Sequence, residues 1–309
     1  MKFHAEKDLG VCGLACVLCS HEDCPGCKVR GCKDGCDCSV YQCAMRKELD
    51  GCYQCKDFPC EEKMLSGIRN RAFNRYARHY GKQALLDRLH INYENGITYH
   101  KPDGLKGDYD QLEAEADILR LVRFGTHNPY VKCPVLETEH FTLRLVEMDN
   151  ANDLLECYSD PKAQEIFNAD KCTSDFRYQT LDEMRECVRF WLTEYNKQAF
   201  VRFAIMNKAS NKAVGTIEMF GMVGQYNTQR GVLRLDISSD YEEKACLHEL
   251  FSLCVEEFFS LFAVGQIVTK AAPIADKRIK ILSELGFTAY DYPEREHYWA
   301  KNKEQECEY

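Results

Sequence analysis

The sequence predicts an α+β protein in two parts: a small cysteine-rich module with a helical tail, followed by a mixed β-sheet flanked by helices. Two observations predict this division. Twelve of the nineteen cysteines lie between Cys12 and Cys60, whereas beyond about residue 136 apolar strands alternate with amphipathic helices. A chain of 309 residues is long enough for two domains. We expect the cysteine-rich module and its tail at 1–125, a linker at 126–135 and the sheet domain at 136–309.

The cysteines of the first part follow the spacing of metal ligands. Three pairs have the pattern CxxC, in which a tight turn lets two thiolates hold one ion from the same side. The sequence therefore predicts a zinc-knuckle module with two or three structural zinc ions, because a closed four-thiolate site leaves no position for water. The candidate ligands are Cys12, Cys16, Cys19, Cys24, Cys27, Cys32, Cys36, Cys38, Cys43, Cys52, Cys55 and Cys60.

Two other uses of these cysteines remain open. Iron–sulfur clusters use the same ligands, and a secreted protein would join the cysteines as disulfides. Acidic Glu6 and Asp8 precede the apolar segment 11–20, which argues against a signal peptide, so we expect a cytoplasmic protein with reduced thiols. No apolar run approaches the length of a membrane span. The net charge of −9 argues against non-specific binding to nucleic acid or anionic membranes.

The tail of the first part is predicted to be helical from about residue 61, with further helices over 83–89 and 111–124. One helix carries a basic stripe at helical spacing: Arg71, Arg75, Arg78 and Lys82. Such a stripe contacts nucleic acid or a phosphate-rich ligand in some proteins, but a solvated helix face is the interpretation that we adopt. A protein partner for this basic helix is also expected.

The second part alternates strands with helices. Two strands over 201–207 and 213–220 are separated by a short polar loop and are expected to form a hairpin. Longer amphipathic patterns predict helices over 181–195, 242–262 and 276–285. Further strands are expected at 141–148, 231–238, 265–272 and 297–302, and short helices at 152–160 and 161–168.

These segments resemble, in the same order, the GNAT superfamily of acyl-CoA N-acyltransferases over about residues 136–303. Residues 136–161 resemble the opening strand and first helix, and 202–220 resemble the central hairpin. Residues 238–259 occupy the place of the acyl-CoA loop and helix, and LSELGF at 282–287 is similar to a common terminal motif. The first part, over about 1–125, resembles a cysteine-rich bacterial and archaeal family of unknown function.

The resemblance implies an acyl-CoA loop at the amino terminus of a helix, where backbone amides face the diphosphate. The residues that it assigns to this site are Ile237, Glu242, Glu243, Lys244, Ala245, Cys246 and Leu247. The family's usual glycines and basic residue are absent here. We therefore expect the two carboxylates to repel a diphosphate and Leu247 to crowd it, with Lys244 offsetting part of the charge.

For catalysis, the resemblance implies a carboxylate base and a tyrosine acid. Glu218 and Asp236 are the candidate bases. Leu282 stands where the family often has tyrosine, so Tyr298 is the candidate acid, with Tyr290 and Tyr292 as nearby alternatives. The function predicted in this way is N-acetyl transfer from acetyl-CoA or another acyl-CoA to a small amine or a protein amino group. The alternative is a catalytically degenerate GNAT-fold binding or regulatory protein that has lost its acyl-CoA loop.

Overall fold

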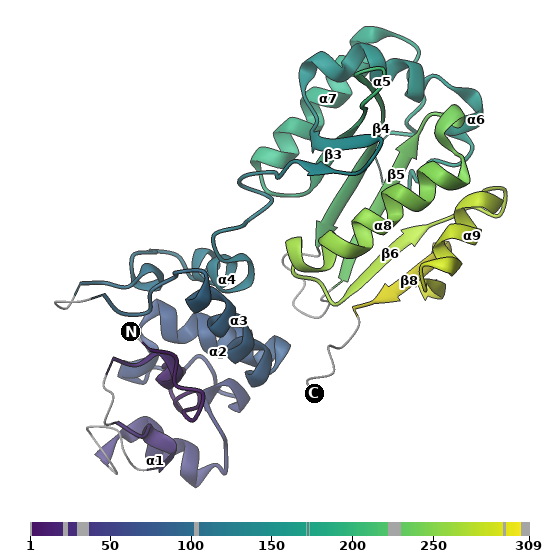
Figure 1. The fold of residues 1–309 in the computed structure, drawn as a ribbon. Helices are drawn as coiled ribbons and strands as arrows, with labels where there is room; N and C mark the ends of the chain where they lie inside the picture. The colour runs from purple at the N-terminus through teal and green to yellow at the C-terminus, as the bar shows by residue number, and fades with distance from the viewer. Residues whose placement is uncertain are drawn as a thin grey trace. The chain divides into compact units, whose positions relative to one another are not determined.

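The computed structural model describes residues 2–20, 24–29, 37–101, 105–170, 172, 174–221, 230–292 and 295–303. The chain packs as two compact units, Met1–Thr126 and His127–Tyr309 (Figure 1). Among the described residues, no helix has both the length and the apolar character needed to span a bilayer.

The first unit consists of short turns followed by helices. A core of buried apolar residues surrounds Phe73, Tyr99 and Tyr109, and a smaller cluster around Val11 and Phe58 contains several cysteines. The predicted helix over 111–124 begins only at Glu115, after a separate turn. The elements are η1 (Cys16–Leu18), η2 (Cys27–Val29), α1 (Ser39–Arg46), η4 (Cys52–Gln54), η5 (Lys63–Leu65), α2 (Ile68–Tyr80), α3 (Lys82–Glu94), η7 (Asp108–Asp110) and α4 (Glu115–Phe124).

The basic stripe of α2 and α3 is not a solvated face. Arg71 and Arg75 form ion pairs with Glu115 of α4. Arg78 donates to the carbonyl of Tyr53, 2.8 Å away, and Lys82 binds Asp8 and Asp50 at 2.7 and 3.2 Å. The expectation of a solvated face is therefore wrong, because these cations join α2 and α3 to the cysteine-bearing turns and to α4.

The second unit is one mixed eight-stranded sheet with helices on both faces. The strand order is β1-β2-β3-β4-β5-β6-β8-β7, and only β5 and β6 are parallel neighbours. The strands are β1 (Leu136–Glu137), β2 (Phe141–Leu145), β3 (Val201–Asn207), β4 (Lys212–Gly221), β5 (Arg230–Ile237), β6 (Gln266–Lys270), β7 (Thr288–Tyr292) and β8 (Arg295–Asn302). The predicted hairpin is β3 and β4; the two edge strands β1 and β7 were not predicted.

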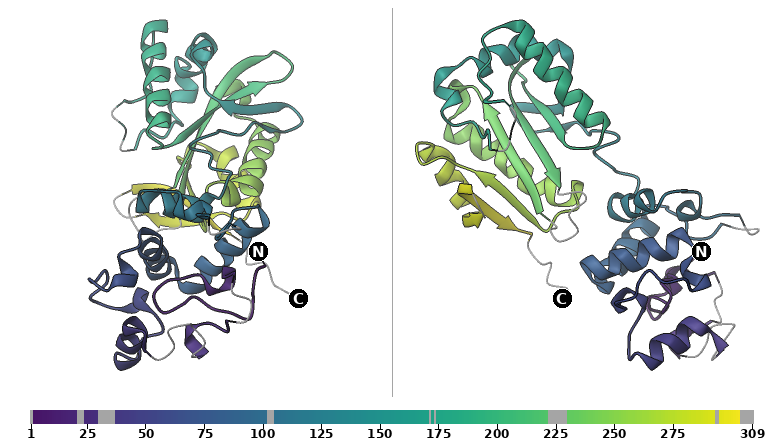
Figure 2. Two further views of the ribbon diagram at one scale, coloured as in Figure 1. Left: turned by 90° about the vertical axis from the view of Figure 1, so that its left-hand side faces the viewer. Right: turned by 180° about the vertical axis from the view of Figure 1, so that it is seen from behind.

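The helices divide between the two faces of the sheet (Figure 2). The first face packs against α5 and α7 through Ala204 and Met206, and the second against α8, where Phe203 stacks on Phe258 at 5.6 Å. Thr180 and Glu183 form a capping box that starts α7. The helices are α5 (Ala151–Tyr158), α6 (Pro161–Gln164), α7 (Leu181–Asn196), α8 (Lys244–Leu261) and α9 (Asp276–Glu284), with short turns η8 (Met148–Asn150) and η9 (Ser239–Tyr241).

The parallel strands β5 and β6 part before β5 ends. Their pairing runs only from Arg230 to Leu233 on β5, whereas β5 continues to Ile237. The chain then passes through η9 into α8, so the amino terminus of a long helix lies just beyond the carboxyl end of β5. In an α/β arrangement this is a position where ligands bind, because free backbone groups and a helix terminus meet there.

Candidate functional site

A row of alternating charges crosses three central strands on the face covered by α5 and α7. Arg202 of β3 is the cross-strand partner of Glu218 on β4, which is in turn the partner of Arg234 on β5. One step along the strands, Thr216 is the partner of Asp236. Because side chains two residues apart share a face, all five lie on the same side of the sheet.

Arg202 is the centre of this cluster. Its guanidinium forms a short ion pair with Glu218, donates to Thr216 Oγ1 at 3.0 Å and lies 3.3 Å from Asp236 Oδ2. It also lies over the ring of Trp191, 4.2 Å from the centroid. Arg202 and Asp236 are 1% and 0% exposed, so a buried cation is compensated by two buried carboxylates and an aromatic face.

Asp236 is less well compensated than Glu218. Burial raises its pKa, although the charge of Arg202 and a hydrogen bond from Tyr158 at 3.0 Å oppose that rise. Its second oxygen, Oδ1, accepts no hydrogen bond from any residue that the structure describes. Burial, together with the negative charge of Asp236, also raises the pKa of the Tyr158 hydroxyl well above its ordinary value. Burial at this end of the cluster therefore opposes ionisation of Asp236, and its contacts with Arg202 and Tyr158 offset part of that cost.

A cavity of about 370 Å³ opens over the charged row. Its walls are mainly aromatic, with Phe176, Trp191 and Phe200 among them, and its sheet side is formed by Glu218 together with Arg202 and Arg234. Of the three predicted catalytic residues, Glu218 alone lines this cavity. The pocket is therefore mainly aromatic, and its single carboxylate is already paired with two guanidinium groups.

Tyr298 joins the same network from β8. Its hydroxyl lies 3.3 Å from Asp170 Oδ2, and the carbonyl of Asp170 accepts a hydrogen bond from Arg234 at 2.9 Å. Arg234 is in turn 3.5 Å from Glu218. The structure thus brings Glu218, Asp236 and Tyr298 into one network of polar contacts on one face of the sheet. Asp236 and Tyr298, at 0% and 2% exposed, are enclosed within it.

The predicted acyl-CoA loop is held by α9. Arg278 binds both carboxylate oxygens of Glu242, at 2.9 and 2.8 Å, and donates to the carbonyl of Leu235 at 2.9 Å. Next to this buried pair, Glu243 is bound by Lys277 at 2.5 Å. Both carboxylates that were expected to repel a diphosphate are therefore paired with cations of α9.

The environment of the loop is more cationic than the sequence alone suggested. The ammonium group of Lys280 lies beside Lys244 and lowers the pKa of Lys244. Arg278 and Lys277 are thus paired with Glu242 and Glu243, while Lys244 lies near Lys280, Lys277 and the carboxylate of Glu284. The expected crowding by Leu247 is wrong, because its side chain is fully buried in the core.

The first amides of α8 lie at the amino end of the helix, before its regular hydrogen bonds begin. Leu247 donates the first intrahelical hydrogen bond of α8, to the carbonyl of Glu243 at 2.9 Å, so the amides of Lys244, Ala245 and Cys246 precede the helical ladder. Ile237, the last residue of β5, is buried. The residues that the sequence assigned to acyl-CoA would therefore contact it through their backbone amides and through the charge of Lys244.

Several residues of the site were missed by sequence reasoning: Tyr158, Asp170, Arg202, Arg234 and Arg278. One signal was available, because Arg202 and Arg234 are charged residues inside strands that are otherwise apolar on both faces. Such a strand is buried on both sides, and a buried charge requires a partner.

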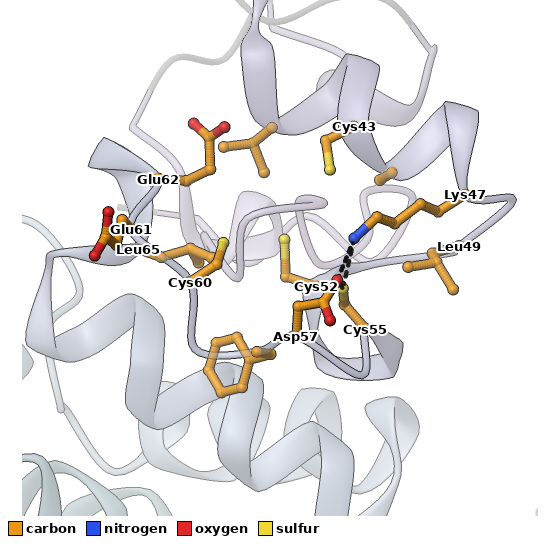
Figure 3. A pocket seen from close by; sticks show the side chains of 13 residues that line it. Cys43, Lys47, Leu49, Cys52, Cys55, Asp57, Cys60, Glu61, Glu62 and Leu65 are labelled. Carbon is orange, nitrogen blue, oxygen red and sulfur yellow. Dashed lines mark hydrogen bonds and ion pairs between the residues drawn. The ribbon is translucent and has the colours of Figure 1, made fainter.

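Several described cysteines of the first unit lie near one another, and Cys12 interacts with Cys27 and Cys38 as well as with Cys52. Cys16 and Cys27 are hydrogen-bonded neighbours, and that contact lowers the pKa of Cys27 to about 6. Cys43, Cys52, Cys55 and Cys60 line a separate cavity of about 430 Å³ (Figure 3). Cys32 and Cys36 lie outside the described residues, and the described cysteines are free thiols. Within the described chain, no three His, Cys, Asp or Glu side chains are grouped closely enough to hold one ion.

Comparison with known proteins identifies two segments. Residues 140–288 match the family model "Acetyltransferase (GNAT) domain", and residues 19–64 match "Protein of unknown function (DUF3795)". The chain is similar to "Uncharacterized N-acetyltransferase p20" of Bacillus licheniformis, with 25% identity over 152 residues that cover 49% of this chain and 81% of that protein.

Solved structures of acetyltransferases also match. The ribosomal-protein-S5-alanine acetyltransferase from Vibrio fischeri is 16% identical, with a TM-score of 0.44 over 55% of this chain and 97% of that chain. A GNAT-family acetyltransferase from Bacillus anthracis is 15% identical, with a TM-score of 0.44 over 56% and 100% of the two chains. The resemblance found in the sequence is confirmed by the two family models: the second unit of this chain contains a GNAT acetyltransferase domain, and the first contains a DUF3795 segment.

Proposed function

We propose that the second unit, with residues 136–309 as its domain and 126–135 as the preceding linker, transfers an acyl group from acyl-CoA to an amine. The acceptor is a small amine or a protein amino group. The observation that carries this proposal is the aromatic cavity with Glu218 on its sheet side. It belongs to a GNAT domain in which the parting of β5 and β6 leads directly to the amino terminus of α8.

The residues of the chain divide the proposed chemistry between them. Acyl-CoA supplies an acyl group activated as a thioester. Glu218 orients the amine and takes its proton as the new carbon–nitrogen bond forms and the carbon–sulfur bond breaks. Tyr298, held by Asp170, donates a proton to the leaving thiolate. Asp236 contacts both Arg202 and Tyr158, so its proposed contribution is to hold these two side chains in place.

The donor site is proposed at the start of α8. The first amides of α8 and the positive end of the helix dipole favour an anion there. Lys244 and Lys280 add charge for a diphosphate. The pairs Glu242–Arg278 and Glu243–Lys277 neutralise the carboxylates that would otherwise oppose it.

Acetyl-CoA binding tests this proposal. Acetyl-CoA in large excess is expected to raise the melting temperature of the second unit. Reversal of the two lysine charges, Lys244→Glu with Lys280→Glu, is expected to weaken binding at least tenfold in isothermal titration. Lys197→Glu, an exposed change just after the end of α7, is the matched control and should bind like the wild type. Absence of binding by acetyl-CoA and by longer acyl-CoAs would refute the proposal.

One observation favours the second candidate, a GNAT fold that binds or regulates without transferring acyl groups. Arg278 already donates to Leu235, on the part of β5 that is free of β6, and Glu242 fixes it there. If this pair closes the donor site, Glu242→Gln combined with Arg278→Met should increase the affinity for CoA. If the pair supports the site, as the first candidate requires, the double variant should bind CoA no better than the wild type.

For the first unit we propose structural zinc at the group that contains Cys16 and Cys27. The turn η1 brings Cys16 and Cys19 within one knuckle, with the amide of Cys19 bonded to the carbonyl of Cys16 at 3.1 Å. Cys27 supplies the facing thiol. The next two cysteines along the chain, Cys32 and Cys36, lie outside the described residues. Elemental analysis of wild type and Cys16→Ser tests this site, since the variant should lose bound zinc.

A further inference from the structure

We propose that the cavity lined by Cys43, Cys52, Cys55 and Cys60 binds an iron–sulfur cluster, with one thiolate for each of four irons. This inference is independent of acyl transfer and of zinc at the first cysteine group. The four cysteines are all among the described residues, so the arrangement of this donor set, unlike that of the Cys16 group, can be judged as a whole.

The four thiols reach the cavity from different elements. Cys43 comes from α1, Cys52 and Cys55 from the turn η4, and Cys60 from the segment beyond it. The sulfur atoms of Cys43, Cys52 and Cys60 point into one space in Figure 3, and that of Cys55 lies at its edge beside Lys47. The turn itself is fixed by backbone bonds: the amide of Cys52 donates to Val11 at 2.8 Å, and that of Cys55 to Cys52 at 3.0 Å.

A cluster and a single ion require different spacings of their donor atoms. Four thiolates on one zinc stand about 2.3 Å from the metal, which brings their sulfurs within about 4 Å of one another. Here no three described donors are grouped closely enough to hold one ion. In a cubane cluster each thiolate binds its own iron and sulfide fills the space between, so the four sulfurs stand apart around a central volume.

The size and lining of the cavity agree with this occupant. Its volume of about 430 Å³ is many times the roughly 30 Å³ of a water molecule, and so far exceeds the need of one ion. Between the cysteines its walls combine apolar side chains, Val40, Leu49 and Phe58 among them, with the charged side chains of Lys47, Asp57, Glu61 and Glu62. Low polarity and hydrogen bonds to sulfur are the means by which proteins stabilise such clusters and set their potentials.

Lys47 gives the site a second, independent feature. Its ammonium group lies 3.5 Å from Cys55 Sγ and is held there by Asp57 at 2.6 Å. A cation that donates to a ligating sulfur stabilises the reduced, more negative state of a cluster. Lys47 is therefore a residue that tunes the site without being a ligand.

Anaerobic metal analysis tests the ligand set. Protein purified without oxygen, or reconstituted with ferrous iron and sulfide, should contain about four iron and four acid-labile sulfide per chain and absorb visible light. Cys43→Ser and Cys60→Ser should each reduce both contents by more than half. Cys246→Ser, a half-buried cysteine of the second unit, is the matched control and should leave them unchanged.

A ligand-preserving variant tests the site even if the serine variants fail to fold. Lys47→Met should retain iron and sulfide but shift the midpoint potential of the cluster to a more negative value in a potentiometric titration. One zinc per chain without labile sulfide, lost on Cys43→Ser, would overturn the cluster. Iron and sulfide contents that ignore both cysteine changes would overturn the ligand set, and an unchanged potential in Lys47→Met would overturn the role of Lys47.

Discussion

The guanidinium of Arg202 organises the candidate acceptor site. It binds Glu218 and Asp236 at once and lies over Trp191, so one buried cation fixes two carboxylates and the orientation of an aromatic wall. Buried ion pairs contribute little to stability compared with apolar residues of the same size, because desolvation offsets their attraction. Here the ion pair of Arg202 with Glu218 instead fixes the orientation of the Glu218 side chain toward the cavity.

Removal of Arg202 should destabilise the second unit strongly. Arg202→Met leaves Glu218 and Asp236 buried without their shared cation, and loss of one partner from a buried pair costs about 3–5 kcal/mol. Urea unfolding followed by tryptophan fluorescence measures the loss. Arg185→Met, on the exposed face of α7, is the control and should change stability by about 0.5 kcal/mol or less. A loss below about 1 kcal/mol for Arg202→Met would show that the cluster is solvated or differently paired.

Glu218→Gln should lower catalysis and leave donor binding intact. The amide keeps the size of the side chain but cannot take a proton, and loss of a general base reduces turnover by about 10²–10⁴-fold. Release of CoA from acetyl-CoA in the presence of a panel of amines gives the rate, and titration with acetyl-CoA checks the donor site. Glu186→Gln on α7 is the matched control. Equal CoA release by Glu218→Gln and wild type would remove Glu218 from the chemistry.

Individual site residues were predictable only in part from the sequence. Glu218 and Asp236 were proposed because the resemblance points to carboxylates on central strands, and Tyr298 because it is one of the tyrosines near the place where the family often has one. The role of Arg202 and Arg234 depends on the strand register, which places each of them opposite Glu218. Glu242 and Arg278 are 36 residues apart, and only the packing of α9 beside the loop joins them. Cross-strand and helix–loop partners of this kind leave no local signal in a sequence.

At the scale of elements, α8 is tied to the start of β2 by a titrating pair. His140 lies 2.9 Å from Glu249, and its backbone amide donates to the same carboxylate at 2.7 Å. The contact with Glu249 raises the pKa of His140. Partial burial opposes the ionised form of Glu249, but hydrogen bonds from Thr138 and His140 outweigh it and lower its pKa. The pair is thus most favourable where both groups are charged.

The stabilisation by this pair should depend on pH in a defined window. The part due to His140 is fully present below its ordinary pKa of about 6.5 and is lost as pH rises through the raised value. The part due to Glu249 is present above about 4.3 and is lost as pH falls through the lowered value. The melting-temperature difference between wild type and Glu249→Gln should therefore be largest near pH 5–6 and smaller at pH 8 and pH 3.5. A difference that grows steadily up to pH 8 would contradict the pairing.

The helices and central strands were predictable because periodicity marks them. The pattern predicted a helix over 181–195, and α7 runs from Leu181 to Asn196. The short edge strand β1 and the mostly exposed strand β7 have no apolar pattern strong enough to detect. The separation of β5 from β6 could not be predicted from the sequence either. It depends on where the two strands stop pairing and not on the composition of either strand.

At the scale of the whole molecule, the chain has two units that each hold their own apolar core. Phe73, Tyr99 and Tyr109 belong to the first, and Leu154, Val188 and Trp191 to the second. After about residue 125 the sequence changes from a cysteine-rich stretch with a helical tail to alternating strands and helices. We expected two parts from this change, because the two kinds of sequence build cores by different means. The function of the first unit did not follow from the same pattern, since thiol spacing alone leaves zinc and iron–sulfur clusters open.

Two cores of this kind should unfold in two transitions, and each ligand should shift the temperature of only one of them. Acetyl-CoA at a hundredfold excess over its Kd stabilises the folded state that binds it by about 2.7 kcal/mol. For a unit the size of His127–Tyr309 that corresponds to a rise of roughly 5–10 °C in one calorimetric transition. Removal of metal with a chelator should lower the other transition and leave the first in place, because metal held by thiolates contributes directly to folding. A single transition that both treatments move together would show instead that the two cores fold as one cooperative unit.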